Sequence, residues 1–111
     1  MATLKAFAQH VTEQLPSLEI SARPMFGEYG IYCRDKIFGL LCDNTLFIKV
    51  TPAGETFAPQ QERGAPYPGA RPYLKISEAQ LADDEWLTEL VSITVEALPA
   101  PKPKTRKPKF A

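Results

Sequence analysis

Apolar residues recur at helical spacing near the start of the chain. The stripe they form has four positions, three or four residues apart: Leu4, Ala8, Val11 and Leu15. This period predicts an amphipathic helix over residues 3–15. Thr3 is a suitable N-cap, and Pro16 ends the helix because proline cannot continue it. His10 lies beside the stripe, so we expect it at the surface.

From residue 29 the period changes to that of strands. Three short runs rich in β-branched and aromatic residues follow one another: Tyr29–Arg34, Ile37–Cys42 and Leu46–Val50. Hairpin-length breaks with turn residues separate them, which predicts a three-stranded antiparallel meander. Gly30 and Gly39 lie inside these runs and indicate a bulge or the close approach of another element.

The next segment is less regular. Thr51 and Pro52 favour the start of a short helix, with Pro at the first helical position and Phe57 as its buried residue. Prolines and glycines then predict irregular or edge-like chain as far as residue 71. Residues 72–76 read as a further strand.

The last predicted element is a helix from residue 77 to about Leu98. Ser77 and Gln80 match a capping box at its start. From Trp86 onward the apolar residues fill an arc of roughly 160° on the helical wheel. A face of that width must be covered, either by this domain's own sheet or by the sheet together with a partner subunit. The second arrangement would be a homodimer.

Charge divides the chain into a body and a tail. The last ten residues hold five of the 13 basic residues and no acid: Lys102, Lys104, Arg106, Lys107 and Lys109. Residues 1–98 therefore carry a formal charge of −5 and the tail +5. Repeated prolines predict that 99–111 is a disordered, extended tail. Its cations leave several roles open: weak, sequence-independent contact with DNA or RNA, contact with the acidic body or with an acidic partner, or simple solvation of the chain.

The composition is that of one small globular domain. The 111 residues are 44% hydrophobic and 23% charged, which are ordinary values. No run reaches the ~20 apolar residues of a membrane span. Cys33 and Cys42 form neither a CxxC pair nor a disulfide framework, so strand packing is expected for both. Together these features predict a cytoplasmic protein that does not contact a membrane.

A search for catalytic patterns finds none. The chain has no HExxH, GxSxG, GxGxxG or Walker sequence. Its one histidine makes a base for a Ser or Cys nucleophile improbable. The acidic run from Asp83 to Glu85 suits the start of a helix better than a metal site. We therefore predict a non-enzymatic domain without metal or cofactor; the rival hypothesis is a small enzyme that uses Cys33 or Cys42.

The phrase RPMFGEYGIY at residues 23–32 resembles the opening motif of the TfoX N-terminal domain family. The matching positions are Arg23, Met25, Phe26, Gly27, Gly30 and Ile31. The second and third predicted strands, FGLL and LFIKV, continue the resemblance, which extends over about residues 3–98. It covers nearly the whole body and agrees in the order and spacing of several elements.

This resemblance implies a two-layer α+β domain, similar to type III secretion chaperones. About five antiparallel strands are flanked by helices. The better-known members are bacterial transcriptional co-regulators of competence genes that act with another protein regulator. They carry a second helical domain, which this sequence does not show. The resemblance supplies no catalytic residues, so it implies a regulatory or adaptor domain that works through protein–protein contacts.

The motif also has two interpretations in terms of its residues. In the structural one, Met25 and Phe26 fill the core where the chain passes from helix to sheet. Gly27 and Gly30 then permit turns or close packing. In the functional one, a ligand or partner surface is centred on Arg23, Glu28 and Tyr29.

Overall fold

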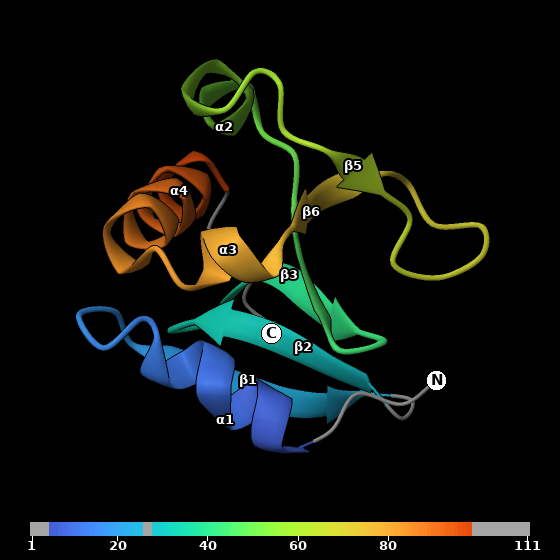
Figure 1. Ribbon diagram of the computed structural model, residues 1–111, viewed down its shortest axis with the longest axis vertical. Helices are drawn as coiled ribbons and strands as arrows, with labels where there is room; N and C mark the ends of the chain where they lie inside the picture. The colour runs from blue at the N-terminus through green and yellow to red at the C-terminus, as the bar shows by residue number, and fades with distance from the viewer. Residues whose placement is uncertain (1–4, 26–27, 99–111) are drawn as a thin grey trace, which may run out of the picture.

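The computed structural model describes residues 5–25 and 28–98. Its elements in chain order are α1 (Lys5–Glu13), β1 (Ile20–Met25), β2 (Glu28–Cys33), β3 (Lys36–Cys42), β4 (Thr45–Ile48), α2 (Pro52–Phe57), β5 (Arg63–Gly64), β6 (Tyr73–Ile76), α3 (Glu78–Leu81) and α4 (Asp84–Ala97). The described residues form one antiparallel sheet of six strands with flanking helices (Figure 1). The α+β prediction is therefore confirmed.

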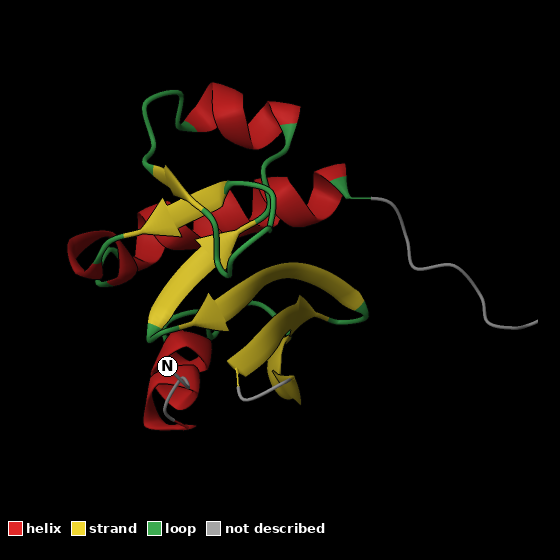
Figure 2. Ribbon diagram, turned by 90° about the vertical axis from the view of Figure 1, so that its right-hand side faces the viewer, coloured by secondary structure: helices red, strands yellow, loops and turns green. Residues whose placement is uncertain are grey.

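The sheet is a meander with a later addition. Its strand order is β1-β2-β3-β4-β6-β5, so the first four strands are neighbours in sequence and in space. The predicted three-stranded meander is present, and Figure 2 shows the strong twist of the sheet. The strand β1 was not predicted. It lies at the sheet edge and is half exposed, so its sequence ISARPM lacks the apolar run of a central strand.

The two meander turns explain the strand boundaries. Asp43 and Asn44 both have positive φ, 52° and 54°, as a two-residue type I′ hairpin requires. Arg34 also has positive φ, 57°, and the first turn lies one residue earlier than predicted. As a result Lys36 starts β3 instead of ending a turn.

The close approach expected at Gly39 is present, and the approaching element is the backbone of β4. A Cβ at this position would lie less than 3.0 Å from the carbonyl oxygen of Phe47 on β4, and 3.3 Å from the Cα of Ile48. The β2–β3 register shifts beside it, between Ile31 and Tyr32. The predicted bulge and the predicted close approach therefore occur together in β3.

The helices cover one face of the sheet and enclose the larger core cluster. Its fully buried members come from helices and strands alike: Val11, Leu15, Ile31, Phe38, Leu41, Ile48, Leu74, Leu87, Leu90 and Val91. The wide apolar side of α4 is covered by the sheet and also by α2 and α3. The ring of Phe57 on α2 lies 6.0 Å from that of Trp86 on α4. His10 is exposed, as predicted.

The prediction of one helix from residue 77 to 98 is wrong. The capping box of Ser77 is present, but it starts only the short helix α3. Asp83 then takes a non-helical conformation, and its carboxylate accepts a hydrogen bond from the Trp86 N–H at 3.3 Å. Asp83 is thus the N-cap of α4, because its side chain competes for a backbone donor that an unbroken helix would use.

Candidate functional site

The sheet face opposite the helices carries a second, smaller apolar cluster. Leu40, Cys42 and Phe47 are buried there, and partly buried side chains of Met25, Ile37 and Tyr73 pack against them. The loop of residues 65–72 projects on this side of the sheet, away from α3 and α4 (Figure 1). The strands are therefore apolar on both faces, although the helices cover only one.

This cluster forms the floor of a cavity of about 580 Å³, which we call the second-face cavity. The residues lining it are Met25, Glu28, Tyr29, Ile37, Leu40, Cys42, Lys49, Pro66, Tyr67 and Tyr73. Most of this lining is apolar or aromatic, and its polar atoms are a few side-chain groups. Tyr67 is 56% exposed and lies in the loop that forms one wall.

The described motif residues meet in the hairpin of β1 and β2. Arg23 lies opposite Gly30, and Met25 lies opposite Glu28. Phe26 and Gly27 lie outside the described residues. The structural interpretation placed Met25 in the core between helix and sheet, and this is wrong. Met25 belongs to strand β1 and packs on the second face of the sheet.

The proposed surface site divides into two places. Glu28 and Tyr29 line the second-face cavity, whereas the Arg23 guanidinium lies 4.4 Å from the centroid of the Tyr32 ring. That distance is typical of a cation–π contact. Gly30 leaves room for this packing, since a Cβ there would lie 3.0 Å from Met25 Cε and 3.2 Å from Tyr32 Cε1.

The ionisable groups on the cavity floor are held neutral. Burial raises the pKa of the Cys42 thiol, and the nearby Glu28 carboxylate raises it further. Burial also raises the pKa of the Tyr73 hydroxyl, with smaller contributions from Tyr67 and Cys42. At neutral pH these groups are therefore hydrogen-bond donors, and the Cys42 thiol is not activated as a nucleophile.

A third feature, which we call the edge hollow, lies between α1 and the β1–β2 part of the sheet. It measures about 530 Å³ and is lined by Lys5, Ala8, Gln9, Thr12, Ile20, Ser21, Ala22, Pro24 and Tyr29. Tyr29 therefore borders both the edge hollow and the second-face cavity. Because β1 is an end strand of the sheet, its outer main-chain groups pair with no other strand of residues 5–25 and 28–98.

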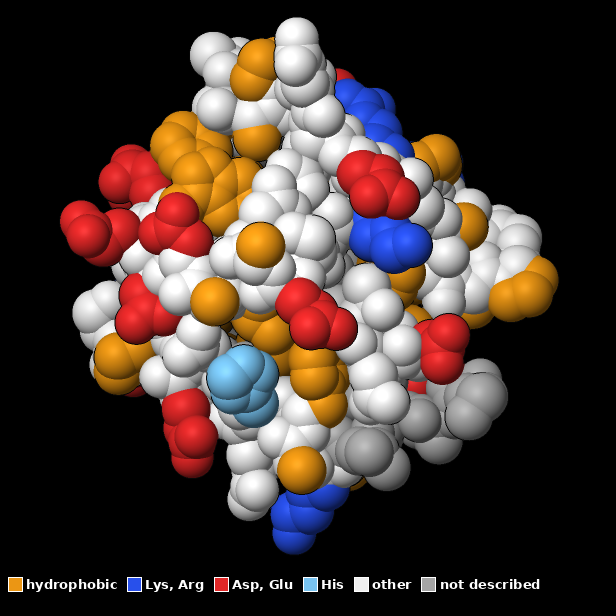
Figure 3. Space-filling model, in the orientation of Figure 1, with side chains coloured by type: hydrophobic (Ala, Val, Ile, Leu, Met, Phe, Trp, Pro, Cys, Tyr) orange, Lys and Arg blue, Asp and Glu red, His pale blue; other side chains and the backbone are white. Residues whose placement is uncertain are grey.

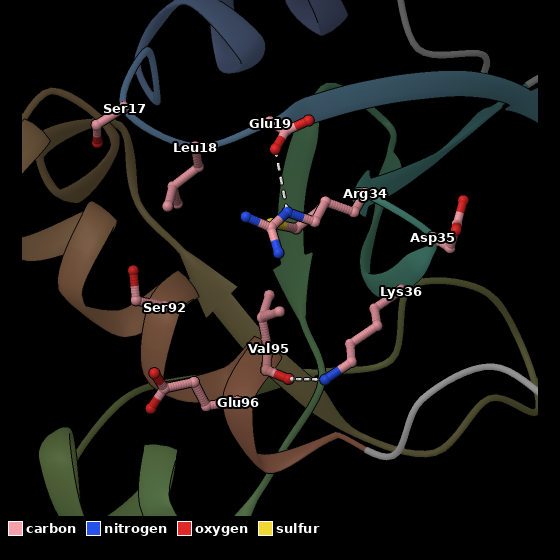
Figure 4. A pocket seen from close by; sticks show the side chains of 10 residues that line it. Ser17, Leu18, Glu19, Arg34, Asp35, Lys36, Ser92, Val95 and Glu96 are labelled. Atoms are coloured by element: carbon pink, nitrogen blue, oxygen red, sulfur yellow. Dashed lines mark hydrogen bonds and ion pairs between the residues drawn. The ribbon is translucent and has the colours of Figure 1, made fainter.

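The pocket in Figure 4 has a structural explanation. It measures about 460 Å³ and lies between residues 17–19, the β2–β3 turn and α4. The Lys36 ammonium donates hydrogen bonds to the carbonyls of Val95 and Leu98, each at 3.0 Å. These carbonyls end α4, where a cation satisfies them and complements the helix dipole. Arg34 is paired with Glu19 at 3.1 Å across the pocket.

Other candidate chemistry is absent from the described part of the chain. Residues 5–25 and 28–98 contain no group of three His, Cys, Asp or Glu side chains placed to hold a metal ion. Within the same ranges, no helix is long and apolar enough to cross a membrane. Cys33 and Cys42 are both buried and free, so the expected strand packing is confirmed.

An acidic patch lies on the described surface. Figure 3 shows acidic side chains gathered over α4, where Asp84, Glu85 and Glu89 are exposed. The five cations of the predicted tail, Lys102 to Lys109, lie outside the described residues. The predicted tail and its contact with nucleic acid therefore stay predictions.

The sequence analysis missed most of the second-face cavity. Leu40, Cys42, Phe47 and Tyr73 alternate with core residues along their strands, so both faces of the sheet are apolar. The alternation could have predicted a second buried face, because a sheet with one solvent-exposed face has polar residues at these positions. The sequence around Pro66 and Tyr67 does not predict that they line this cavity, since their position depends on how the loop returns to β6.

Comparisons with known proteins agree with the motif and the fold. The family model for the TfoX N-terminal domain matches residues 13–98. A protein of Spirochaeta aurantia, described as an uncharacterized 12.7 kDa protein in the trpE 5′ region, is 40% identical over 110 residues. The match covers 98% of this chain and 95% of that protein. This chain belongs to the TfoX N-terminal domain family, a regulatory domain type and not a known enzyme family.

Proposed function

We propose that this domain is a non-enzymatic regulatory adaptor that binds an extended segment of another regulatory protein along the outer edge of β1. The observation that carries the proposal is that β1, which borders the edge hollow, pairs on one side only among the described residues. Strand addition at a sheet edge is a common mode of peptide recognition, in which main-chain hydrogen bonds supply affinity and adjacent pockets supply specificity. Family membership supports the regulatory role.

The register of β1 shows which main-chain groups are available. The Arg34 N–H donates to the Glu19 carbonyl at 2.9 Å, which fixes the hydrogen-bonded positions of the β1–β2 ladder. By alternation, the main-chain groups of Ile20, Ala22 and Pro24 face outward. The Ile20 N–H already donates to Leu18, and Pro24 has none. Ala22 therefore supplies the outward N–H of this strand, flanked by outward carbonyls.

The walls of the edge hollow favour a segment with small and polar side chains. Ala8, Gln9 and Thr12 of α1 form one side, and exposed Ser21 of β1 forms part of the other. Hydroxyl and amide groups of this kind hydrogen-bond to polar side chains. The motif hairpin that begins with Arg23 continues directly from this edge.

Site-specific photocrosslinking in cells tests the proposal. A benzoylphenylalanine at Ser21, on the exposed edge, should form an adduct with one partner protein. The same group at Ala79, exposed on α3, should not. The adduct should disappear with Ala22→Pro, which removes the outward N–H, and persist with the matched control Ala22→Ser.

The thermal midpoint of each variant checks that its fold is intact. If Ala22→Pro unfolds the chain, the test is amide exchange at Ala22 of the unmodified chain in the purified complex. Strand addition must protect that N–H from exchange. Equal adducts from both positions, or an unprotected Ala22 in the complex, would rule out binding at this edge.

A further inference from the structure

We propose that the second-face cavity binds a small aromatic molecule that carries one anionic group. This inference does not depend on partner binding at β1, because it concerns different residues and a different chemistry. It starts from the shape of the cavity. At about 580 Å³ the cavity lies within the ~300–1,000 Å³ typical of small-molecule sites. Its walls come from the β1–β2 hairpin, β3, β6 and the loop of residues 65–72.

The apolar part of the lining favours an aromatic ring. Ile37 and Leu40 supply an aliphatic floor, and Tyr67 and Tyr73 supply aromatic rings. The side chain of Tyr29 packs on the larger core instead. Met25 adds a thioether, which makes favourable contacts with aromatic rings. Aromatic pairs gain about 0.5–1.5 kcal/mol beyond the area that they bury. A planar apolar body therefore fits this lining better than a strongly hydrated one.

The polar part of the lining selects an anion. Tyr73 and Cys42 stay protonated at neutral pH and therefore act as donors. Lys49 adds an ammonium group on the same side of the sheet. Within residues 5–25 and 28–98, no carboxylate lies within ion-pair distance of Lys49. A ligand anion would give Lys49 a partner and accept the hydrogen bonds of its neighbours.

The one carboxylate in the lining is already engaged. Glu28 accepts a hydrogen bond from the Asp43 N–H at 3.3 Å, and so helps to hold the β3–β4 turn. The hydrogen bond leaves Glu28 negatively charged, and this charge raises the pKa of Cys42.

The two charges lie at opposite ends of β3, because Glu28 is beside Asp43 whereas the Lys49 N–H donates to the Phe38 carbonyl. Lys49 also follows Ile48, which pairs with Leu74, and so lies beside Tyr73. The anionic group of a ligand should therefore lie beside Lys49 and Tyr73, away from Glu28.

Two fluorescent probes with the same ring system test the inference on the full chain. One is 8-anilinonaphthalene-1-sulfonate, an anion, and the other is N-phenyl-1-naphthylamine, its neutral counterpart. The anion should bind at a single saturable site. Lys49→Gln should weaken it by about tenfold or more, the usual effect of losing a charged hydrogen-bond partner. The neutral probe should change less than about twofold.

Two further variants complete the design. Lys75→Gln is the matched control, since Lys75 lies on β6 outside the cavity lining and pairs with Glu62 at 3.8 Å. It should change neither affinity. Ile37→Trp, at a partly buried position in the lining, should fill the cavity and weaken both probes. Thermal midpoints show whether each variant is folded.

The results separate the alternatives. Anion binding that is insensitive to Lys49→Gln, or equal losses for both probes, would overturn the anion selectivity on which the proposal depends. Binding that survives Ile37→Trp in a folded chain would place the probe elsewhere and overturn the site. None of these outcomes bears on the edge of β1, so the proposed function is tested separately by crosslinking.

Discussion

Replacement of Gly39 by alanine should destabilise this domain more than any other single methyl addition that we consider. The new Cβ would lie less than 3.0 Å from the Phe47 carbonyl oxygen, and the side chain of Ile31 lies only 3.3 Å away. The obstacle is backbone of the neighbouring strand, so rotation of a side chain cannot relieve it. The β3–β4 ladder, in which Gly39 pairs with Ile48, must therefore shift.

The magnitude follows from overpacking and from the damaged ladder. Overpacking alone costs about 1–3 kcal/mol, and a weakened ladder hydrogen bond adds about 1 kcal/mol. We expect Gly39→Ala to lower the free energy of unfolding by about 3 kcal/mol. For a domain of this size that corresponds to a fall of roughly 10–25 °C in thermal midpoint.

Urea unfolding followed by the fluorescence of Trp86, the one tryptophan of the chain, measures the effect. Gly64→Ala is the matched control, because its Cβ would make ordinary contacts of 3.5 Å and 3.6 Å. That change should alter stability by less than about 1 kcal/mol, since the loss of unfolded-chain entropy favours alanine where the backbone permits it. A Gly39→Ala chain as stable as the Gly64→Ala chain would refute the steric argument.

Four other predictions concern the thiols, the end of α4, the tail and the oligomeric state. The raised pKa of Cys42 means that the folded chain holds its proton more tightly, so the free energy of unfolding should fall as pH rises above the ordinary thiol range. Thiol titration should accordingly find Cys42 slow to react, and a thiolate well below pH 8.5 would favour the cysteine-enzyme hypothesis. Lys36→Met removes two hydrogen bonds to the end of α4 and should cost about 1–2 kcal/mol, with faster amide exchange confined to the last turn. Duplex DNA binding should occur at low salt with a slope near −4 to −5 and vanish in a chain ending at Leu98; binding unchanged by this truncation would exclude the tail. Sedimentation equilibrium should detect a homodimer at high micromolar concentration, and a 12.3 kDa species alone would contradict it.

The sequence predicted those parts of the fold in which local pattern and tertiary packing agree. The meander strands alternate clearly, and Asp43 and Asn44 suit the positive φ of their turn. Thr51 also caps α2 as expected, because its hydroxyl accepts the Gly54 N–H at 3.0 Å. In each case the interactions that decide the conformation lie within a few residues of one another.

The errors arise where distant contacts or competing local signals decide. The strand β1 contains Pro24 and exposed polar residues, and only its pairing with β2 makes it a strand. The residues from 77 to 98 have one continuous apolar face, but two caps, Ser77 and Asp83, divide them into two helices. Part of the wide apolar side of α4 is covered by Phe57 of α2, a contact that no pattern within the last helix indicates.

The candidate site was predicted in part for the same reason. Glu28 and Tyr29 were identified from the motif, and they line the second-face cavity. Arg23 was grouped with them and shares the sheet face of Met25, but its guanidinium packs on Tyr32 and it does not line the cavity. Lys49 directly follows β4 and Tyr73 begins β6, and these strands become neighbours only in the folded sheet. No spacing along the chain therefore connects the two residues with the motif.

The strand order has a consequence for how this chain folds. From β1 to β4, each strand pairs with the one just before it, so these contacts span short loops and cost little chain entropy to close. The β4–β6 pairing must instead close over the segment that holds α2 and β5, and Lys36 meets the end of α4 some sixty residues later. Local contacts form faster than distant ones. The meander is therefore suited to act as the early folding nucleus, on which β6 and α4 dock once the rest of the chain has been synthesised.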